Sequence, residues 1–139
     1  MIPHHTKNKG DLGVAKVKCD LIQRGYLVLN PETEHAPFDI VAYHNGRFSR
    51  IQVKYRAAKH GRIELAFISS WTDKNQHHRV SVDKDNIDHY AIYCPDTDMC
   101  YYINHHNFNG SVTLRLTPPN NNQKHGIHFA SDYEDFLLG

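Results

Sequence analysis

The spacing of apolar side chains predicts one helix near the start of this chain and strands over most of the rest. Residues 11–24 carry apolar residues at the three-to-four spacing of a helix, at Leu12, Ala15, Cys19 and Ile22. Alternating or aromatic-rich stretches then predict strands at 26–29, 38–44, 47–55, 61–68, 89–94, 99–103 and 111–116. A helix, then mostly strands, then a short helix is typical of an α/β (α+β) domain around one mixed sheet.

Polar stretches separate the predicted elements. Residues 30–37 and 69–79 are expected to be loops, and Ser131 is expected to cap the short C-terminal helix. The 139 residues contain no repeat or linker, so we expect a single domain over 1–139. No apolar run approaches the roughly 18 residues that span a bilayer, and the start of the chain lacks a signal-like apolar segment. We therefore expect a cytoplasmic protein without a membrane partner.

A two-residue turn at Asn45-Gly46 sets the register of the predicted hairpin. Asn-Gly favours such turns because both residues tolerate a positive φ angle. With this turn, Asp39 lies directly opposite Gln52, with Cβ atoms roughly 5 Å apart, and Lys54 shares their face on the diagonal. The other face is apolar and is expected to be the core face, with Phe38, Ile40, Ala42, Ile51, Val53 and Tyr55.

The shared face of the hairpin combines three groups with complementary chemistry. The Asp39 carboxylate and the Gln52 amide oxygen are hard ligands of the kind that Mg²⁺ prefers. The Lys54 ammonium is a compact charge that can position a water or stabilise a developing anion. A solvated face of a two-faced sheet is the simpler interpretation, although Asp is depleted in strands.

Basic residues are concentrated in the first half of the chain. Through residue 70 there are eleven Lys or Arg against six Asp or Glu, and after it five against nine, while the net charge is only +1. Clustered positive charge is what contact with phosphates requires, and a solvated strand face accounts for it equally well.

Two short motifs and their order resemble the PD-(D/E)XK nuclease core. A predicted helix and strand precede "PFD" at 37–39, and "QVK" follows at 52–54. The stretch "KGDLGVAKVKCDLIQRGYLVL" is similar to one branch of that superfamily, the small homing endonucleases encoded in bacterial group I introns, whose lysine motif is QxK. The resemblance covers residues 7–60. It implies a PD-(D/E)XK restriction-endonuclease-like core, in which a mixed central β-sheet is flanked by helices.

The resemblance also implies a catalytic set. In that branch an acidic residue on the first helix completes the site, and Asp11 matches it. The implied catalytic residues are Asp11, Asp39, Gln52 and Lys54, with Asp11, Asp39 and Gln52 holding Mg²⁺. This chain departs from the superfamily pattern in two ways, because Phe38 separates Pro37 from Asp39 and Gln52 replaces the usual carboxylate.

The implied function is site-specific hydrolysis of double-stranded DNA, leaving a 5′-phosphate and a 3′-hydroxyl. The resemblance further implies a homo-oligomer, a dimer or tetramer, without an organic cofactor. Two copies would be needed to cut both strands. A restriction-type or junction-resolving nuclease on the same core, and a non-catalytic DNA-binding module, are the alternatives.

Candidate DNA contacts surround the hairpin and the start of the helix. We expect phosphate or groove contacts from Lys7, Lys9, Arg47, Arg50, Arg56, Lys59 and Arg62. The polar stretch 69–79 offers Asn, Gln and Arg side chains with edges suited to reading bases, or is simply solvent-exposed.

Other roles remain open for several of these residues. Asp11 is equally suited to capping the N-terminus of its helix. Glu32, Glu34 and Glu64 are spare carboxylates that could complete the metal site in its place. Twelve histidines raise the possibility of a zinc protein, but the His-His pairs lack the spacing of a zinc motif.

Overall fold

The chain forms one α-helix, ten strands and two short 3-10 helices within the residues that the structure describes. The structure, a computed structural model, describes residues 6–72, 77–81, 86–121 and 125–136. The elements are α1 (Thr6–Gln23), β1 (Leu27–Leu29), β2 (Ile40–His44), β3 (Arg47–Tyr55), β4 (Arg62–Ala66), β5 (Ile68–Thr72), β6 (His77–Ser81), β7 (His89–Cys94), β8 (Met99–Ile103), η1 (His105–Asn107), β9 (Ser111–Arg115), β10 (His128–Phe129) and η2 (Ala130–Tyr133).

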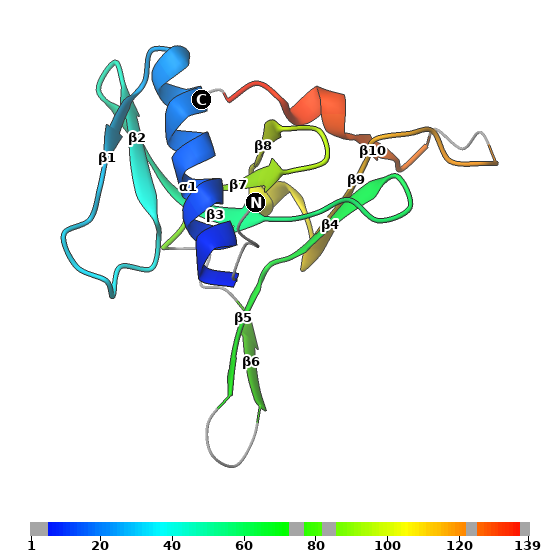
Figure 1. The fold of residues 1–139 in the computed structure, drawn as a ribbon, viewed down its shortest axis with the longest axis horizontal. Helices are drawn as coiled ribbons and strands as arrows, with labels where there is room; N and C mark the ends of the chain where they lie inside the picture. Colours follow the sequence, from blue (N-terminus) through cyan, green and yellow to red (C-terminus); the bar gives the residue numbers. More distant parts are fainter. Residues whose placement is uncertain (1–5, 73–76, 82–85, 122–124, 137–139) are drawn as a thin grey trace.

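A five-stranded mixed sheet in the order β1-β2-β3-β7-β8 forms the centre of the molecule (Figure 1). The pair β3–β7 is parallel, and the other pairs are antiparallel. A second sheet, β10-β9-β4, and a two-stranded ribbon, β5-β6, complete the strands. The predicted mixed α+β architecture is confirmed.

Each face of the central sheet packs against its own buried core. On one face, Val17 and Leu21 of α1 pack against strand residues such as Ile51. On the other face, Ile92 of β7 packs in a cluster with Ile63 from β4 and with β9. The helix and the second sheet therefore cover opposite faces, and the polar residues of β3 lie on the face of the second sheet.

The Asn45-Gly46 turn forms as predicted. Asn45 has φ 50° and Gly46 has φ 80°, the left-handed values that this turn requires. The ladder between β2 and β3 runs from Ile40↔Ile51 to His44↔Arg47. The predicted register is therefore confirmed, and Ile40 and Ile51 are fully buried on the predicted core face.

The buried stripe of α1 differs from the predicted one. Gly13, Val17 and Leu21 are buried, whereas Ala15 is exposed and Ile22 is 60% exposed. The same shift leaves Cys19 exposed. The buried stripe includes a glycine because the helix approaches β3 closely there: a Cβ on Gly13 would lie 3.6 Å from both Val53 Cγ1 and Tyr55 Cβ.

The predicted loop at 69–79 is wrong for its described part. Residues Ile68–Thr72 and His77–Ser81 form the antiparallel ribbon β5–β6, paired from Ile68↔Ser81 to Thr72↔His77. Residues 73–76 lie outside the described residues. The ribbon extends away from the two sheets (Figure 1).

The C-terminal segment begins with a 3-10 helix rather than an α-helix capped by Ser131. The N-cap of η2 is Phe129, without a side-chain cap, so the predicted capping role is wrong. Of the helices in the described ranges, none combines the length and apolar character needed to cross a lipid bilayer.

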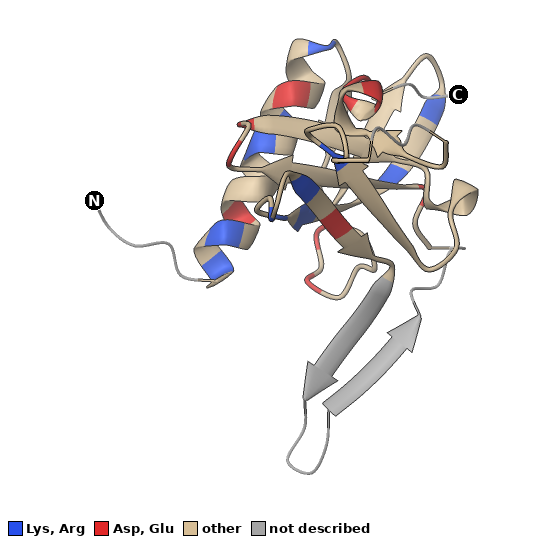
Figure 2. Ribbon diagram, turned by 90° about the vertical axis from the view of Figure 1, so that its right-hand side faces the viewer, with Lys and Arg blue, Asp and Glu red and all other residues tan. Residues whose placement is uncertain are grey.

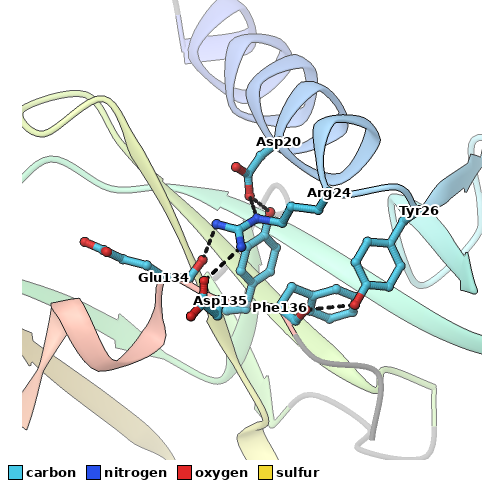
Figure 3. A network of polar contacts seen from close by, with 7 residues as sticks. Asp20, Arg24, Tyr26, Glu134, Asp135 and Phe136 are labelled. Carbon is cyan, nitrogen blue, oxygen red and sulfur yellow. Dashed lines mark hydrogen bonds and ion pairs between the residues drawn. The ribbon is translucent and has the colours of Figure 1, made fainter.

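Arg24 attaches the C-terminal segment to the end of α1 (Figure 3). Its Nε donates to Asp20 Oδ2 at 3.0 Å, its Nη1 to Asp135 Oδ1 at 2.9 Å and its Nη2 to the Glu134 carbonyl oxygen at 2.7 Å. One guanidinium thus joins residues more than one hundred positions apart in the chain.

Replacing Arg24 with methionine is expected to lower the free energy of unfolding by about 1 kcal/mol, because the partners are partly exposed and solvent screens their charges. Thermal unfolding followed by circular dichroism should show a decrease in Tm of roughly 4 °C. Arg47→Met, at an exposed position beside the hairpin turn, is the matched control and should leave Tm unchanged. Equal losses in the two variants would contradict this role of Arg24.

Candidate active site

Asp39 lies in a bend directly before the first residue of β2. Its backbone N–H donates to the Ile51 carbonyl oxygen at 2.9 Å, although Ile51 is already the ladder partner of Ile40, so the regular β2–β3 pairing ends at Ile40 and a pairing of Asp39 with Gln52 stays a prediction. Its Oδ2 then accepts the Val53 N–H at 2.8 Å, in the place of a strand carbonyl. The other carboxylate oxygen, Oδ1, accepts no hydrogen bond from a described residue. One oxygen therefore ends the ladder, and the second remains available for a ligand.

Gln52 and Lys54 lie on one face of β3. Both side chains are half-buried, while the alternating residues Ile51 and Val53 are buried on the α1 face. Lys54 is paired with Ile92 in β7, so it stands near the middle of the central sheet. Asp39 is close enough for its charge to act on Lys54.

Burial dominates the electrostatics of this face. It raises the pKa of Asp39 above its ordinary value, and outweighs the Val53 N–H and the Lys54 charge, which both favour the carboxylate. Burial also lowers the pKa of Lys54, with a smaller contribution from the Arg56 charge and an opposing one from Asp39. Burial thus disfavours both the Asp39 carboxylate and the Lys54 ammonium. A bound cation would strongly stabilise the ionised form of Asp39.

Asp11 lies in the second turn of α1, because the helix begins at Thr6. The N-terminal capping role considered for Asp11 is therefore wrong. Its side chain is exposed. At about 3.6 residues per turn, Asp11 lies on the flank of the helix opposite Lys16, whose Nζ is 2.9 Å from Asp98 Oδ1 in the β7–β8 turn. Asp11 therefore faces the side of the helix nearer to β2.

The spare carboxylates do not assemble a metal site on their own. Glu32 and Glu34 are exposed in the loop before Asp39, and Glu64 Oε1 lies 2.9 Å from Arg62 Nε. Within the described ranges, no three His, Cys, Asp or Glu side chains gather as a metal-binding group.

Nearly the whole chain matches one known family. The family model described as PD-(D/E)XK endonuclease matches residues 4–136. The chain belongs to the PD-(D/E)XK endonuclease family. This confirms the resemblance expected from the sequence, and it extends the match well beyond residue 60.

The fold of this PD-(D/E)XK endonuclease is similar to a solved structure described as that of a bacterial homing endonuclease, I-Ssp6803I. The TM-score is 0.76 at 18% sequence identity, and the match covers 94% of this chain and 88% of the other. The comparison with curated proteins returned no match.

The basic residues of the endonuclease fall into two groups. Arg56, Lys59 and Arg62 line one cavity of about 210 Å³ together with Ala57 and Glu64. The residues on the hairpin tip and the first helical turns are exposed and lie apart from that cavity: Arg47, Lys7 and Lys9. The Nζ of Lys9 lies 6.0 Å from the centre of the Tyr55 ring.

Arg50 of the endonuclease has a structural contact that the sequence did not indicate. Its Nε and Nη2 donate to Asp88 Oδ2 and Oδ1, each at 2.9 Å, and its backbone N–H donates to Oδ2 at 2.8 Å. Asp88 directly precedes β7, so this pair joins β3 to its parallel neighbour. A DNA contact from Arg50 stays a prediction.

The sequence did not predict the ion pair that Glu64 forms near the site. The sequence treated it as a spare metal ligand, whereas the structure pairs it with Arg62 in the basic cavity. The signal was present in the spacing, because residues two apart on a strand share a face.

Proposed function

We propose that this endonuclease cuts double-stranded DNA at specific sites with Mg²⁺ as its cofactor, as a homing endonuclease of the bacterial cytosol, with residues 1–139 acting as one domain. The observation that supports the proposal is that Gln52 and Lys54 share one face of β3, with Asp39 at the start of β2 close enough for its charge to act on Lys54. A carboxylate, an amide oxygen and an ammonium are the groups that metal-assisted hydrolysis of a phosphodiester uses.

Asp39 and Gln52 would hold the divalent ion, with Asp11 as a further oxygen ligand. The available Oδ1 of Asp39 and the hard oxygen donors fit Mg²⁺, which retains several waters. Because α1 covers the face opposite Gln52 and Lys54, Asp11 would have to reach the ion past the edge of β3. A bound divalent ion supplies an acidified water and neutralises charge on the phosphate.

Lys54 would position the attacking water and stabilise the negative charge that develops on the phosphate. Its place in the middle of β3, between β2 and β7, restricts its position, and groups on strands are held more precisely than groups on loops. Half-burial excludes part of the solvent, which strengthens the interaction of its charge with an anion.

The β5–β6 ribbon would supply sequence recognition. A two-stranded ribbon is of a size to enter the major groove, and this one projects from the body of the protein (Figure 1). It follows directly on β4, the strand that carries Arg62. The polar composition of 69–79 is suited to base contacts, and Lys7, Lys9 and Arg47 would contact the phosphates on either side.

A second copy of the chain would be needed to cut both strands, so we propose a homo-oligomer, a dimer or tetramer. Apolar side chains on the face that carries Gln52 are consistent with such an assembly: Leu27 is 62% exposed and Phe48 is 61% exposed. Sedimentation or light scattering of the purified protein measures this directly.

A homing role is favoured over restriction or junction resolution by the fold. The match to the bacterial homing endonuclease covers 94% of this chain and 88% of the other. The location of the reading frame inside a group I intron would support the same role.

Plasmid DNA is expected to be nicked or linearised by the purified protein with Mg²⁺ and to remain intact when EDTA removes the metal. The substrate panel should include the intronless version of the gene that flanks the reading frame, since this is the target of a homing enzyme. Absence of cleavage on every DNA, together with retained DNA binding, would favour the non-catalytic binding module instead.

A further inference from the structure

A rigid turn holds two cations side by side between β3 and β4. The Lys59 N–H donates to the Arg62 carbonyl oxygen at 2.8 Å, and the Arg62 N–H donates back to the Lys59 carbonyl oxygen at 3.1 Å. Gly61 has φ 73°, and a Cβ there would collide with Thr117 Oγ1. The turn is therefore held against the end of β9, and the backbones of Lys59 and Arg62 have little freedom.

The same turn forms one wall of the basic cavity. Arg56, the residue directly after β3, lines the same cavity, and its Nη1 donates to the Tyr55 carbonyl oxygen at 2.9 Å. Its charge acts on Lys54, so the two side chains are near each other. Residues two apart on a strand are separated by roughly 6.6 Å, so the cavity begins one side chain beyond Lys54. It is therefore a continuation of the candidate active site.

Glu64 is the only acid among the described residues that line this cavity. Its carboxylate oxygen lies 2.9 Å from Arg62 Nε, and the two side chains remain 59% and 42% exposed. The Nε atom itself is buried and forms no hydrogen bond, so a ligand would reach Arg62 through the exposed part of the guanidinium. Arg62 also lies directly opposite Arg115 in the β4–β9 ladder, and like charges in that arrangement repel. The cavity therefore carries an excess of positive charge, and in the free protein Glu64 balances part of it. Figure 2 shows that basic positions lie both on the helix and on the strands of the body.

We propose that this cavity binds a backbone phosphate of duplex DNA next to the phosphate that is cut, and that Glu64 occupies Arg62 until the phosphate replaces it. The inference rests on the proposed function, since it places the cavity beside a cleavage site. A phosphate matches the guanidinium fork as a carboxylate does and carries its charge on more oxygens. Glu64 thus acts as an internal competitor that weakens binding to any DNA.

Glu64→Gln tests the competition without metal. In buffer with EDTA, the anisotropy of a short labelled duplex should show binding that is roughly 5-fold tighter than for the wild type. In a salt series between about 50 and 200 mM, the slope of log K against log salt should steepen by roughly 0.9. In the wild type, the carboxylate of Glu64 takes up a cation from solution when the phosphate displaces it, and this uptake offsets one cation released from the DNA. Glu64→Gln takes up no cation, so the salt slope is steeper.

Two control variants assign the effect to Arg62. Glu134→Gln makes the same change in net charge at a residue whose backbone, not its carboxylate, contacts Arg24, and it should bind as the wild type does. In an Arg62→Gln background, Glu64→Gln should no longer tighten binding. Unchanged or weaker binding by Glu64→Gln, an equal gain in Glu134→Gln, or a gain that persists without Arg62 would each overturn the proposal.

Metal affinity distinguishes Glu64 as a competitor of phosphate from Glu64 as a metal ligand. If Glu64 were a metal ligand, Glu64→Gln would lower the affinity for Ca²⁺ in calorimetry, and that result would also overturn the proposal. Failure of the proposed function would give a different result. The wild-type protein would bind duplex DNA in EDTA but would not cleave it with Mg²⁺, and the binding measurements on Glu64→Gln would still test the competition.

Discussion

Replacing Lys54 with methionine is expected to lower the rate of Mg²⁺-dependent DNA cleavage by about 100-fold or more while leaving DNA binding largely intact. Methionine retains the length and the packing of the half-buried side chain and removes only the ammonium. The charge matters most when negative charge develops on the phosphate, so its loss affects the reaction more than the affinity. Single-turnover cleavage of plasmid DNA and duplex anisotropy with Ca²⁺ measure the two effects separately.

Lys18→Met provides the matched control for that experiment. Lys18 is a half-buried residue on α1 outside the proposed catalytic set, so its variant should cleave at the wild-type rate. A Lys54→Met enzyme with wild-type activity would remove Lys54 from the catalytic set and leave the QxK motif without its chemical role.

The second large effect is expected for Asp39→Asn, which should reduce cleavage on the order of 1000-fold and abolish measurable Ca²⁺ binding in calorimetry. Asparagine retains an oxygen that can accept the Val53 N–H, so the end of the β2–β3 ladder is preserved. The loss would therefore report on the charge at the metal rather than on folding.

The pH dependence of Ca²⁺ binding adds an internal check on Asp39. Because burial raises the pKa of Asp39, protons compete with the metal at a higher pH than they do for an ordinary carboxyl group. Wild-type affinity should therefore fall as the pH decreases through that raised value. Glu32→Gln should retain this behaviour, and a loss of Ca²⁺ binding in Glu32→Gln, with Asp39→Asn unaffected, would move the metal site into the loop.

The hairpin was predictable because its local signal agreed with its tertiary environment. Asn45-Gly46 admits one common turn, and that turn determines which residue lies opposite Asp39. The apolar set on the other face, with Ile40 and Ile51, left a single register that buries it. Local geometry alone therefore put Gln52 and Lys54 on the face opposite the apolar set, whereas Asp39 lies just outside the regular ladder.

The helix was predicted in place but with the wrong face inward. Gly13 contributes no apolar side chain, so its close packing on β3 left no trace in the pattern. Asp20 counts as polar in any pattern, yet it is held at the sheet by the Tyr102 hydroxyl. The position of Asp11 depended on this face, which is why the sequence could not place it.

The β5–β6 ribbon was missed because its sequence lacks a strand pattern. A strand is recognised by alternation of apolar and polar residues. Apart from Trp71, the stretch 69–79 is polar, so its sequence does not distinguish a two-stranded ribbon from a loop.

At Asp39, which accepts a hydrogen bond from the Val53 N–H, the stability of the fold and the proposed catalytic role favour different side chains. The pKa of Asp39 is raised in the folded protein, so its ionised form destabilises the fold at every pH above that value. Asparagine would satisfy the same N–H without a charge and would be the more stable choice at neutral pH. Selection for stability alone would discard this aspartate, so a directed-evolution campaign toward thermostability should yield inactive enzymes that carry Asp39→Asn unless cleavage is scored in every round.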